Sequence, residues 1–215
     1  RSNVTVGGAV VATAIDTIPP GSFDEERLMR GHRRQRAVAL GACALAAAVA
    51  VVGAGFPSGA VPPDEWVESL CTSLTTWRDD LTRARTDNEV TEGGLDERRD
   101  AVVSYLRQVT RDTDALLKRL ERDGTPGVPD GKAVARAFRR GFRQARAAFA
   151  DARKEVENLD TDRRRKFENA LEDIRDDITE GAEAVDETFD DASERYDVEA
   201  LDDAFDAEPA CAGIS

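Results

Sequence analysis

Apolar residues recur every three or four positions through most of the chain after residue 60. This spacing places them along one side of an α-helix, whereas a half-buried strand would alternate apolar and polar residues. Clusters of Gly, Pro and Asp interrupt the pattern and indicate turns between helices. The chain is therefore predicted to form four long helices, near residues 64–87, 95–123, 132–159 and 167–196.

Each predicted helix has one apolar stripe that should be buried against the other helices. The stripe of the first helix consists of Val67, Leu70, Cys71, Leu74, Trp77 and Leu81. The stripe of the second consists of Leu95, Val102, Leu106, Val109, Thr113, Leu116 and Leu120. The stripe of the third consists of Ala135, Phe138, Phe142, Ala145, Phe149, Ala152, Val156 and Leu159. The stripe of the fourth consists of Phe167, Leu171, Ile174, Ile178, Ala182, Val185, Phe189, Ala192 and Tyr196.

Capping residues and helix breakers set the expected ends of these helices. Asp64 follows two prolines and is expected to cap the first helix, because a carboxylate accepts hydrogen bonds from the free amides of a first turn. The Asp-Thr-Asp sequence at 160–162 is expected to end the third helix and cap the fourth. Residues 124–131 are expected to form a rigid turn, and Leu201 and Phe205 indicate one more short helical turn near the C-terminus.

Four amphipathic helices joined by short turns favour an all-α fold, in particular an antiparallel up-down four-helix bundle. The abundance of Ala, Leu, Glu and Arg supports helix, since these residues lose little conformational freedom there. The alternative is an elongated three-helix coil with a loosely attached fourth segment.

An uncharged apolar stretch at 37–56 precedes the helical part, with a basic segment at 30–36 before it. Pro57-Ser58-Gly59-Ala60 follows it, so the order is that of a secretory signal peptide, with cleavage preferred after Ala60. A retained signal anchor is the main alternative, because about 20 apolar residues can span a bilayer. A third alternative is lipidation at Cys43, which follows a Leu-Gly-Ala sequence.

These observations divide the chain into three parts. Residues 1–28 precede Met29, the only methionine, and are expected to be a mis-assigned or disordered leader. Residues 29–60 are expected to be a signal peptide or signal anchor. Residues 61–215 are expected to form an extracytoplasmic helical domain, either secreted or held at the membrane by an uncleaved segment 37–56.

Two cysteines, Cys71 and Cys211, are left when Cys43 is assigned to the export segment. An oxidising exterior favours a disulfide between them, which would join the first helix to the last residues of the chain. The alternative is two unrelated thiols.

Charge and histidine content exclude several functions. The net charge of -13 opposes binding to nucleic acid. The only histidine, His32, lies in the basic segment, so the helical part has no imidazole for a nucleophile pair or for a zinc or di-iron site. The Gly131-Lys132 step lacks the spacing and the Ser or Thr of a phosphate-binding loop. We therefore expect neither an enzyme nor a cofactor.

Two charged features are candidate binding surfaces. The first is an arginine stripe on the third helix that could bind anionic groups, although the acidic fourth helix could equally neutralise it; it consists of Arg136, Arg139, Arg140, Arg143 and Arg146. The second is a set of acidic residues on the fourth helix that could bind Ca²⁺ or Mg²⁺ weakly, or could simply be a solvated face. This set consists of Asp176, Asp177, Asp186, Glu187, Asp190 and Asp191.

Several short motifs resemble those of a group of small exported actinobacterial helical proteins whose function is uncharacterised. The motifs are Trp66, Cys71 and Trp77 in the first helix, the Gly124-Thr125-Pro126 turn, and Pro209-Ala210-Cys211 near the C-terminus. The resemblance covers about residues 64–215 and implies a location in the cell envelope. It implies no catalytic residue and no ligand, and this chain carries more charge than the group would suggest.

The sequence therefore favours a non-catalytic exported envelope protein that acts as a helical binding or spacer module. Its partner would be an envelope component or another protein. The main alternatives are a carrier that holds a small apolar ligand near Trp66 and Trp77, and a weak divalent-cation binder. A carboxylate-dependent enzyme is the least favoured reading, because no carboxylate pair stands out.

Overall fold

The computed structural model describes residues 60–89, 93–196 and 198–212, and within helix α5 it does not place the side chains of 184–186. The predicted leader and the predicted export segment up to residue 59, with Cys43 in it, lie outside the described residues. Ala60, the preferred residue before signal cleavage, is the first residue described. Among the helices of the described part, none combines the length and the apolar character needed to cross a membrane.

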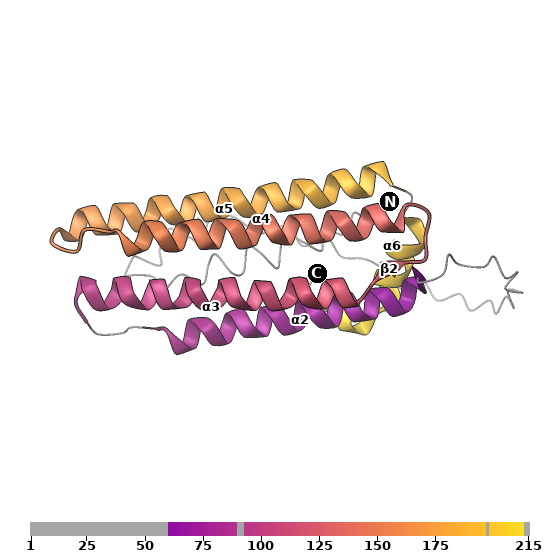
Figure 1. Ribbon diagram of the computed structural model, residues 1–215, viewed down its shortest axis with the longest axis horizontal. Helices are drawn as coiled ribbons and strands as arrows, with labels where there is room; N and C mark the ends of the chain where they lie inside the picture. Colours follow the sequence, from indigo (N-terminus) through magenta and orange to yellow (C-terminus); the bar gives the residue numbers. More distant parts are fainter. Residues whose placement is uncertain (1–59, 90–92, 197, 213–215) are drawn as a thin grey trace, which may run out of the picture. The chain divides into compact units, whose positions relative to one another are not determined.

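The described chain is almost entirely helical, which confirms the all-α class (Figure 1). The long helices are α2 (Pro63–Asp87), α3 (Leu95–Arg122), α4 (Gly131–Glu157) and α5 (Arg164–Arg195). The shorter elements are strands β1 (Ala60–Val61) and β2 (Thr125–Pro126), helix α6 (Glu199–Ala207) and the 3₁₀-helix η2 (Pro209–Cys211). The predicted helices agree with the observed ones closely, except that α5 begins three residues before its first apolar residue.

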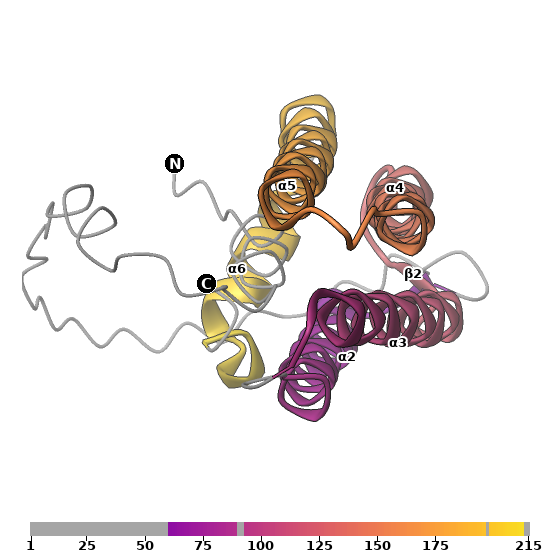
Figure 2. The same ribbon diagram turned by 90° about the vertical axis from the view of Figure 1, so that its left-hand side faces the viewer.

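Helices that follow one another in the chain pack against one another: α2 with α3, α3 with α4, and α4 with α5. Helix α6 and η2 pack against α2 (Figure 2). The chain reverses direction between successive long helices, as Figure 1 shows for the α2–α3 and α4–α5 pairs.

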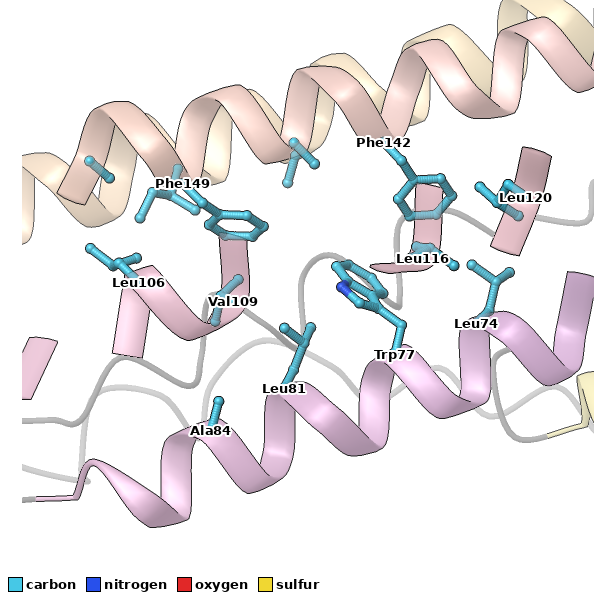
Figure 3. Packing of buried hydrophobic residues seen from close by; sticks show 14 of the residues in the cluster. Leu74, Trp77, Leu81, Ala84, Leu106, Val109, Leu116, Leu120, Phe142 and Phe149 are labelled. Carbon is cyan, nitrogen blue, oxygen red and sulfur yellow. The ribbon is translucent and has the colours of Figure 1, made fainter. Parts of the chain in front are cut away.

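The predicted apolar stripes form a single buried core (Figure 3). All six residues of the α2 stripe are buried, and Val109, Leu116 and Val156 are fully excluded from solvent. A few predicted stripe residues are only partly buried and lie at the edge of this core; they are Leu95, Phe138, Leu159, Phe189 and Tyr196. The side chain of Val185 is not described. Helical periodicity thus identified the core correctly, because burial on one helix face requires that spacing.

The predicted N-cap of α2 is wrong. The helix begins one residue earlier, at Pro63, and Pro62 is its N-cap without any side-chain hydrogen bond. Trp66 donates its backbone N–H to the carbonyl of Pro62 at 2.9 Å. Proline suits the first helical position because its missing N–H would have had no partner there. Asp64 instead lies within the first turn, where its negative charge interacts favourably with the positive end of the helix dipole.

The predicted cap of α5 is also wrong, since its N-cap is Arg163 and no side chain caps it. Asp160 accepts a hydrogen bond from the backbone N–H of Asp162 at 2.9 Å and so stabilises the turn itself. The hydroxyl of Thr161 donates to Asp96 on α3 at 2.8 Å. The Asp-Thr-Asp segment therefore connects the α4–α5 turn to the start of α3, a contact that local sequence cannot reveal.

Residues 124–131 form a turn, as expected, but also the unexpected strand β2. It pairs in parallel with β1, with Ala60 opposite Thr125 and Val61 opposite Pro126. The turn needs glycine at two positions. Gly124 has a φ of +79°, and a Cβ atom on Gly131 would lie 2.0 Å from the carbonyl oxygen of Pro126. The segment that enters α2 and the segment that enters α4 are thus fixed to each other.

We expect Gly131→Ala to destabilise the protein, because the added Cβ cannot fit beside the Pro126 carbonyl without movement of the backbone. Overpacking of this kind typically costs about 1–3 kcal/mol. Lys132→Ala, at the neighbouring exposed position, is the control and should change stability little. Denaturant unfolding of the two variants and the parent measures both effects, and equal stability of G131A and the parent would show that the turn is not constrained as described.

Candidate functional site

The first candidate feature is the disulfide between Cys71 of α2 and Cys211 of η2, which the structure contains as predicted. The two Cα atoms are 5.1 Å apart, and 140 positions separate the cysteines in the sequence. Both side chains are buried, with Cys71 fully excluded from solvent. A cross-link that closes so long a loop stabilises the folded state by about 5 kcal/mol in the chain-entropy treatment.

Polar contacts hold the C-terminal segment in place beside this bridge. The carboxylate of Glu208 accepts the backbone N–H of Ala210 at 2.8 Å and thereby caps η2. The hydroxyl of Thr75, one turn after Cys71 on α2, donates to the carbonyl of Ala210 at 3.5 Å. Leu201 of α6 is also buried in the core. The C-terminal segment is therefore an integral part of the fold.

The second feature is the buried indole of Trp77, which lies between the helices (Figure 3). Its Nε1–H donates to the hydroxyl of Thr113 on α3 at 3.1 Å. Thr113 is itself buried, and its hydroxyl donates to the carbonyl of Val109 at 2.8 Å. The predicted apolar stripe of α3 thus contains a threonine because the indole N–H needs a buried acceptor.

Aromatic rings extend this contact from α2 to α4 and α5. Trp77 meets Phe142 edge to face, with the ring centroids 5.4 Å apart. Trp66 meets Phe138 in the same way at 5.7 Å. Phe189 of α5 lies against both phenylalanines, at 4.7 Å from Phe138 and 5.9 Å from Phe142. The rings therefore pack at the place where a carrier would hold an apolar ligand, near Trp66 and Trp77.

The five arginines of the predicted stripe have different surroundings in the structure. Arg146 forms a two-pronged ion pair with Asp114 of α3, at 3.0 and 3.2 Å. The hydrogen bond that Arg146 donates to this carboxylate raises the pKa of Arg146. Arg139 donates to the carbonyl of Leu120 at 3.5 Å. Both partners lie on α3, so for these two arginines the expected neutralisation by the acidic fourth helix is not what the structure shows.

The other three arginines of the stripe, Arg136, Arg140 and Arg143, are exposed. Within the described residues, none of the three has a carboxylate oxygen within 4.0 Å. Arg140 differs from the other two because it lines a cavity in the groove between α4 and α5. Sequence reasoning missed its partners in that cavity, which include Gln144, Thr188 and Arg195. The sequence signal for this cavity was the spacing of its residues, i, i+4 for Arg140 and Gln144 and i, i+7 for Thr188 and Arg195, which places each pair on one face of its helix.

The acidic residues proposed as a weak cation site are exposed along α5, apart from Asp186, whose side chain is not described. In the described part of the chain, no three His, Cys, Asp or Glu side chains come together as metal ligands would. Further along the chain, burial raises the pKa of Asp202 on α6, with smaller contributions from Asp206 and Asp203.

A polar cluster that sequence reasoning did not anticipate lies between α2 and α3. Burial raises the pKa of Asp112, and the negative charge of Asp80 on α2 raises it further. Burial likewise raises the pKa of Asp123, although Ser73 of α2 donates a hydrogen bond to it at 3.3 Å. Oδ2 of Asp112 and two guanidinium nitrogens of Arg119 are buried without a hydrogen-bond partner. The ionised form of Asp112 is therefore disfavoured in the folded state.

No protein-family model matches the chain, and neither a curated protein nor a solved structure shows significant similarity to it. The Cys71–Cys211 disulfide is present, and Trp66 and Trp77 lie in a cluster with phenylalanine rings. Membership of an actinobacterial group has no support from these comparisons and stays a prediction.

Thr113→Val should destabilise the protein by about 1–3 kcal/mol, because the buried indole N–H of Trp77 loses its acceptor. Thr110→Val is a matched control on the same helix. Thr110 also donates its hydroxyl to the carbonyl four residues earlier, that of Leu106, at 2.7 Å. The described hydrogen bonds of Thr110 include none with a tryptophan. Unfolding followed by Trp fluorescence measures both variants, and a loss in T113V no larger than that in T110V would contradict this role.

Asp112→Asn should raise the stability at pH 7, because asparagine removes a charge that burial and Asp80 disfavour. A carboxyl whose folded-state pKa is raised destabilises the protein when ionised and ceases to do so when it is protonated. The gain should therefore shrink as the pH falls through the raised pKa of Asp112. Asp173→Asn, at an exposed position of α5, is the control. Thermal unfolding of both variants at neutral and acidic pH checks the sign, and a gain that grows on acidification would refute it.

Proposed function

We propose that this chain is a non-catalytic exported protein of the cell envelope, in which a disulfide-closed helical domain acts as a binding or spacer module. The single observation that carries the proposal is the Cys71–Cys211 disulfide. Structural disulfides persist in oxidising compartments and are rare in the reducing cytoplasm. The predicted export segment at 29–60 accounts for how the domain would reach such a compartment.

For the architecture we propose an antiparallel up-down four-helix bundle. Its support is that each long helix packs against the next and that the chain reverses direction between them. The alternative with a loosely attached fourth segment is less favoured, because Phe167, Leu171 and Ile174 of α5 are buried in the common core. A rod of long helices is suited to holding its two ends apart, since each residue adds about 1.5 Å of length.

A spacer or binding module is favoured over an apolar-ligand carrier by the packing around the two tryptophans. Trp66 and Trp77 are 3% and 0% exposed, and phenylalanine rings pack against both. A carrier needs an apolar cavity of some hundreds of Å³, whereas the described contacts of both tryptophans are close packing with other rings. The weak cation binder is less favoured because the acidic side chains of α5 are spread along an exposed face.

A non-catalytic role is favoured by the chemistry of the residues. The part of the chain after residue 60 has no histidine, which is the commonest general acid and base. Its two remaining cysteines are joined to each other and cannot act as nucleophiles. The partner would be an envelope component or a protein. Nucleic acid is disfavoured by the net charge of -13.

The test is to express the full chain in a bacterial host with its own export segment, to fractionate the cells and to map the thiols by mass spectrometry. We expect the domain outside the cytoplasm, with Cys71 and Cys211 in one linked peptide pair. The variant Cys71→Ser/Cys211→Ser should fold less stably by up to about 5 kcal/mol. Cys43→Ala is the control and should leave the linked pair unchanged.

Recovery of the full-length chain from the cytosol, with both cysteines open to alkylation, would overturn the proposal. Recovery outside the cytoplasm with a free N-terminus at Val61 would also identify the cleavage site. A chain that stays in the membrane fraction would instead identify segment 37–56 as an anchor.

A further inference from the structure

A small cavity lies in the groove between α4 and α5, with a volume of about 130 Å³. This space is several times the volume of one water molecule and suffices for a group of a few heavy atoms. It is lined by Arg140 and Gln144 of α4, and by Thr188, Asp191, Ala192, Arg195 and Tyr196 from the end of α5.

Packing beneath the cavity holds its two walls in place. The ring of Phe189 on α5 lies 4.7 Å from that of Phe138 on α4, so the helices are fixed to each other at this level. The buried Ala192 forms the floor, where a larger side chain would fill the space. The hydroxyl of Thr188 donates to Oε1 of Gln144 at 3.2 Å and joins the two walls directly. The two helices that form the walls of the cavity are therefore in direct contact with each other.

The charges in the cavity favour an anion. Two guanidinium groups face it from different helices, against one carboxylate, which leaves a net charge of +1. Arg195 reaches Asp191 only at 4.0 Å, and Arg140 has no carboxylate within that distance in the described part of the chain. Because Oε1 of Gln144 already accepts a hydrogen bond, its NH₂ group is left to donate. A local positive excess is unusual on a chain whose net charge is -13.

We infer that this cavity is a binding site for a small oxyanion, namely a phosphate or carboxylate group, held between Arg140 and Arg195. The planar guanidinium matches the paired oxygens of both groups and binds them through two parallel hydrogen bonds. Gln144 and Tyr196 also line the cavity, and an NH₂ group and a phenol hydroxyl can donate further hydrogen bonds. The site goes beyond the proposed envelope role and does not depend on it.

The test titrates the full-length oxidised protein with inorganic phosphate and, separately, with acetate, at an ionic strength held constant with sodium chloride. Binding is followed by calorimetry and by the amide NMR signals of residues 188–196. We expect saturable binding of at least one anion. Arg140→Gln and Arg195→Gln should each weaken it about tenfold or more, since each removes charged hydrogen bonds. Asp191→Asn should tighten it, because a competing carboxylate is lost.

The matched control is Arg136→Gln, which removes an exposed arginine from the same helix but from outside the cavity. It should change the affinity less than about twofold. Saturation by phosphate, by acetate or by both supports the site and identifies the group it takes. The absence of saturable binding with both anions would overturn the inference, as would equal losses in R136Q and R140Q. If neither anion binds, the proposed location and the disulfide of the proposed function are not affected.

Discussion

The buried aromatic contact around Trp77 is the interaction on which the rest of the structure depends. Its indole joins α2 to Thr113 of α3 by a hydrogen bond and to Phe142 of α4 by ring packing, and Phe142 in turn meets Phe189 of α5. One chain of contacts thus reaches all four long helices. Large aromatic side chains bury more apolar area than most others, so this link contributes strongly to the packing of the four helices.

The disulfide complements this packing at the C-terminal end of the chain. Helix α6 has nine residues, too few for stable helix on its own, and its packing partner among the helices is α2. The Cys71–Cys211 bridge fixes η2, which follows α6, to α2 in the interior of the core. The β1–β2 pair does the same for the segment that enters α2, by joining it to the turn before α4. Both ends of the described domain are therefore secured by contacts between distant parts of the chain.

Charged side chains of the same kind have different surroundings in this protein, whose net charge is strongly negative. Arg146 is satisfied by Asp114 and Arg139 by a backbone carbonyl, both on α3, whereas Arg140 faces a cavity with a second arginine. Arginines that look equivalent in the sequence therefore make different contacts: some bind groups on α3, and one lines a cavity. The acidic residues also differ in their surroundings. The charge of Asp112 is disfavoured by burial between α2 and α3, whereas the described acidic side chains of α5 that were predicted to bind a cation are exposed.

The sequence by itself determined the helices and their buried faces, because apolar residues three or four positions apart lie on one side of a helix. It also indicated the cysteine pair, since only two cysteines follow residue 60. Tertiary structure alone decided the partners of Arg146 and Thr161, the β1–β2 pair, the raised pKa of Asp112 and the cavity at Arg140. Each of these brings together residues far apart in the chain. Such contacts depend on how neighbouring helices are rotated and offset, and the side-chain pattern within one helix does not fix either quantity.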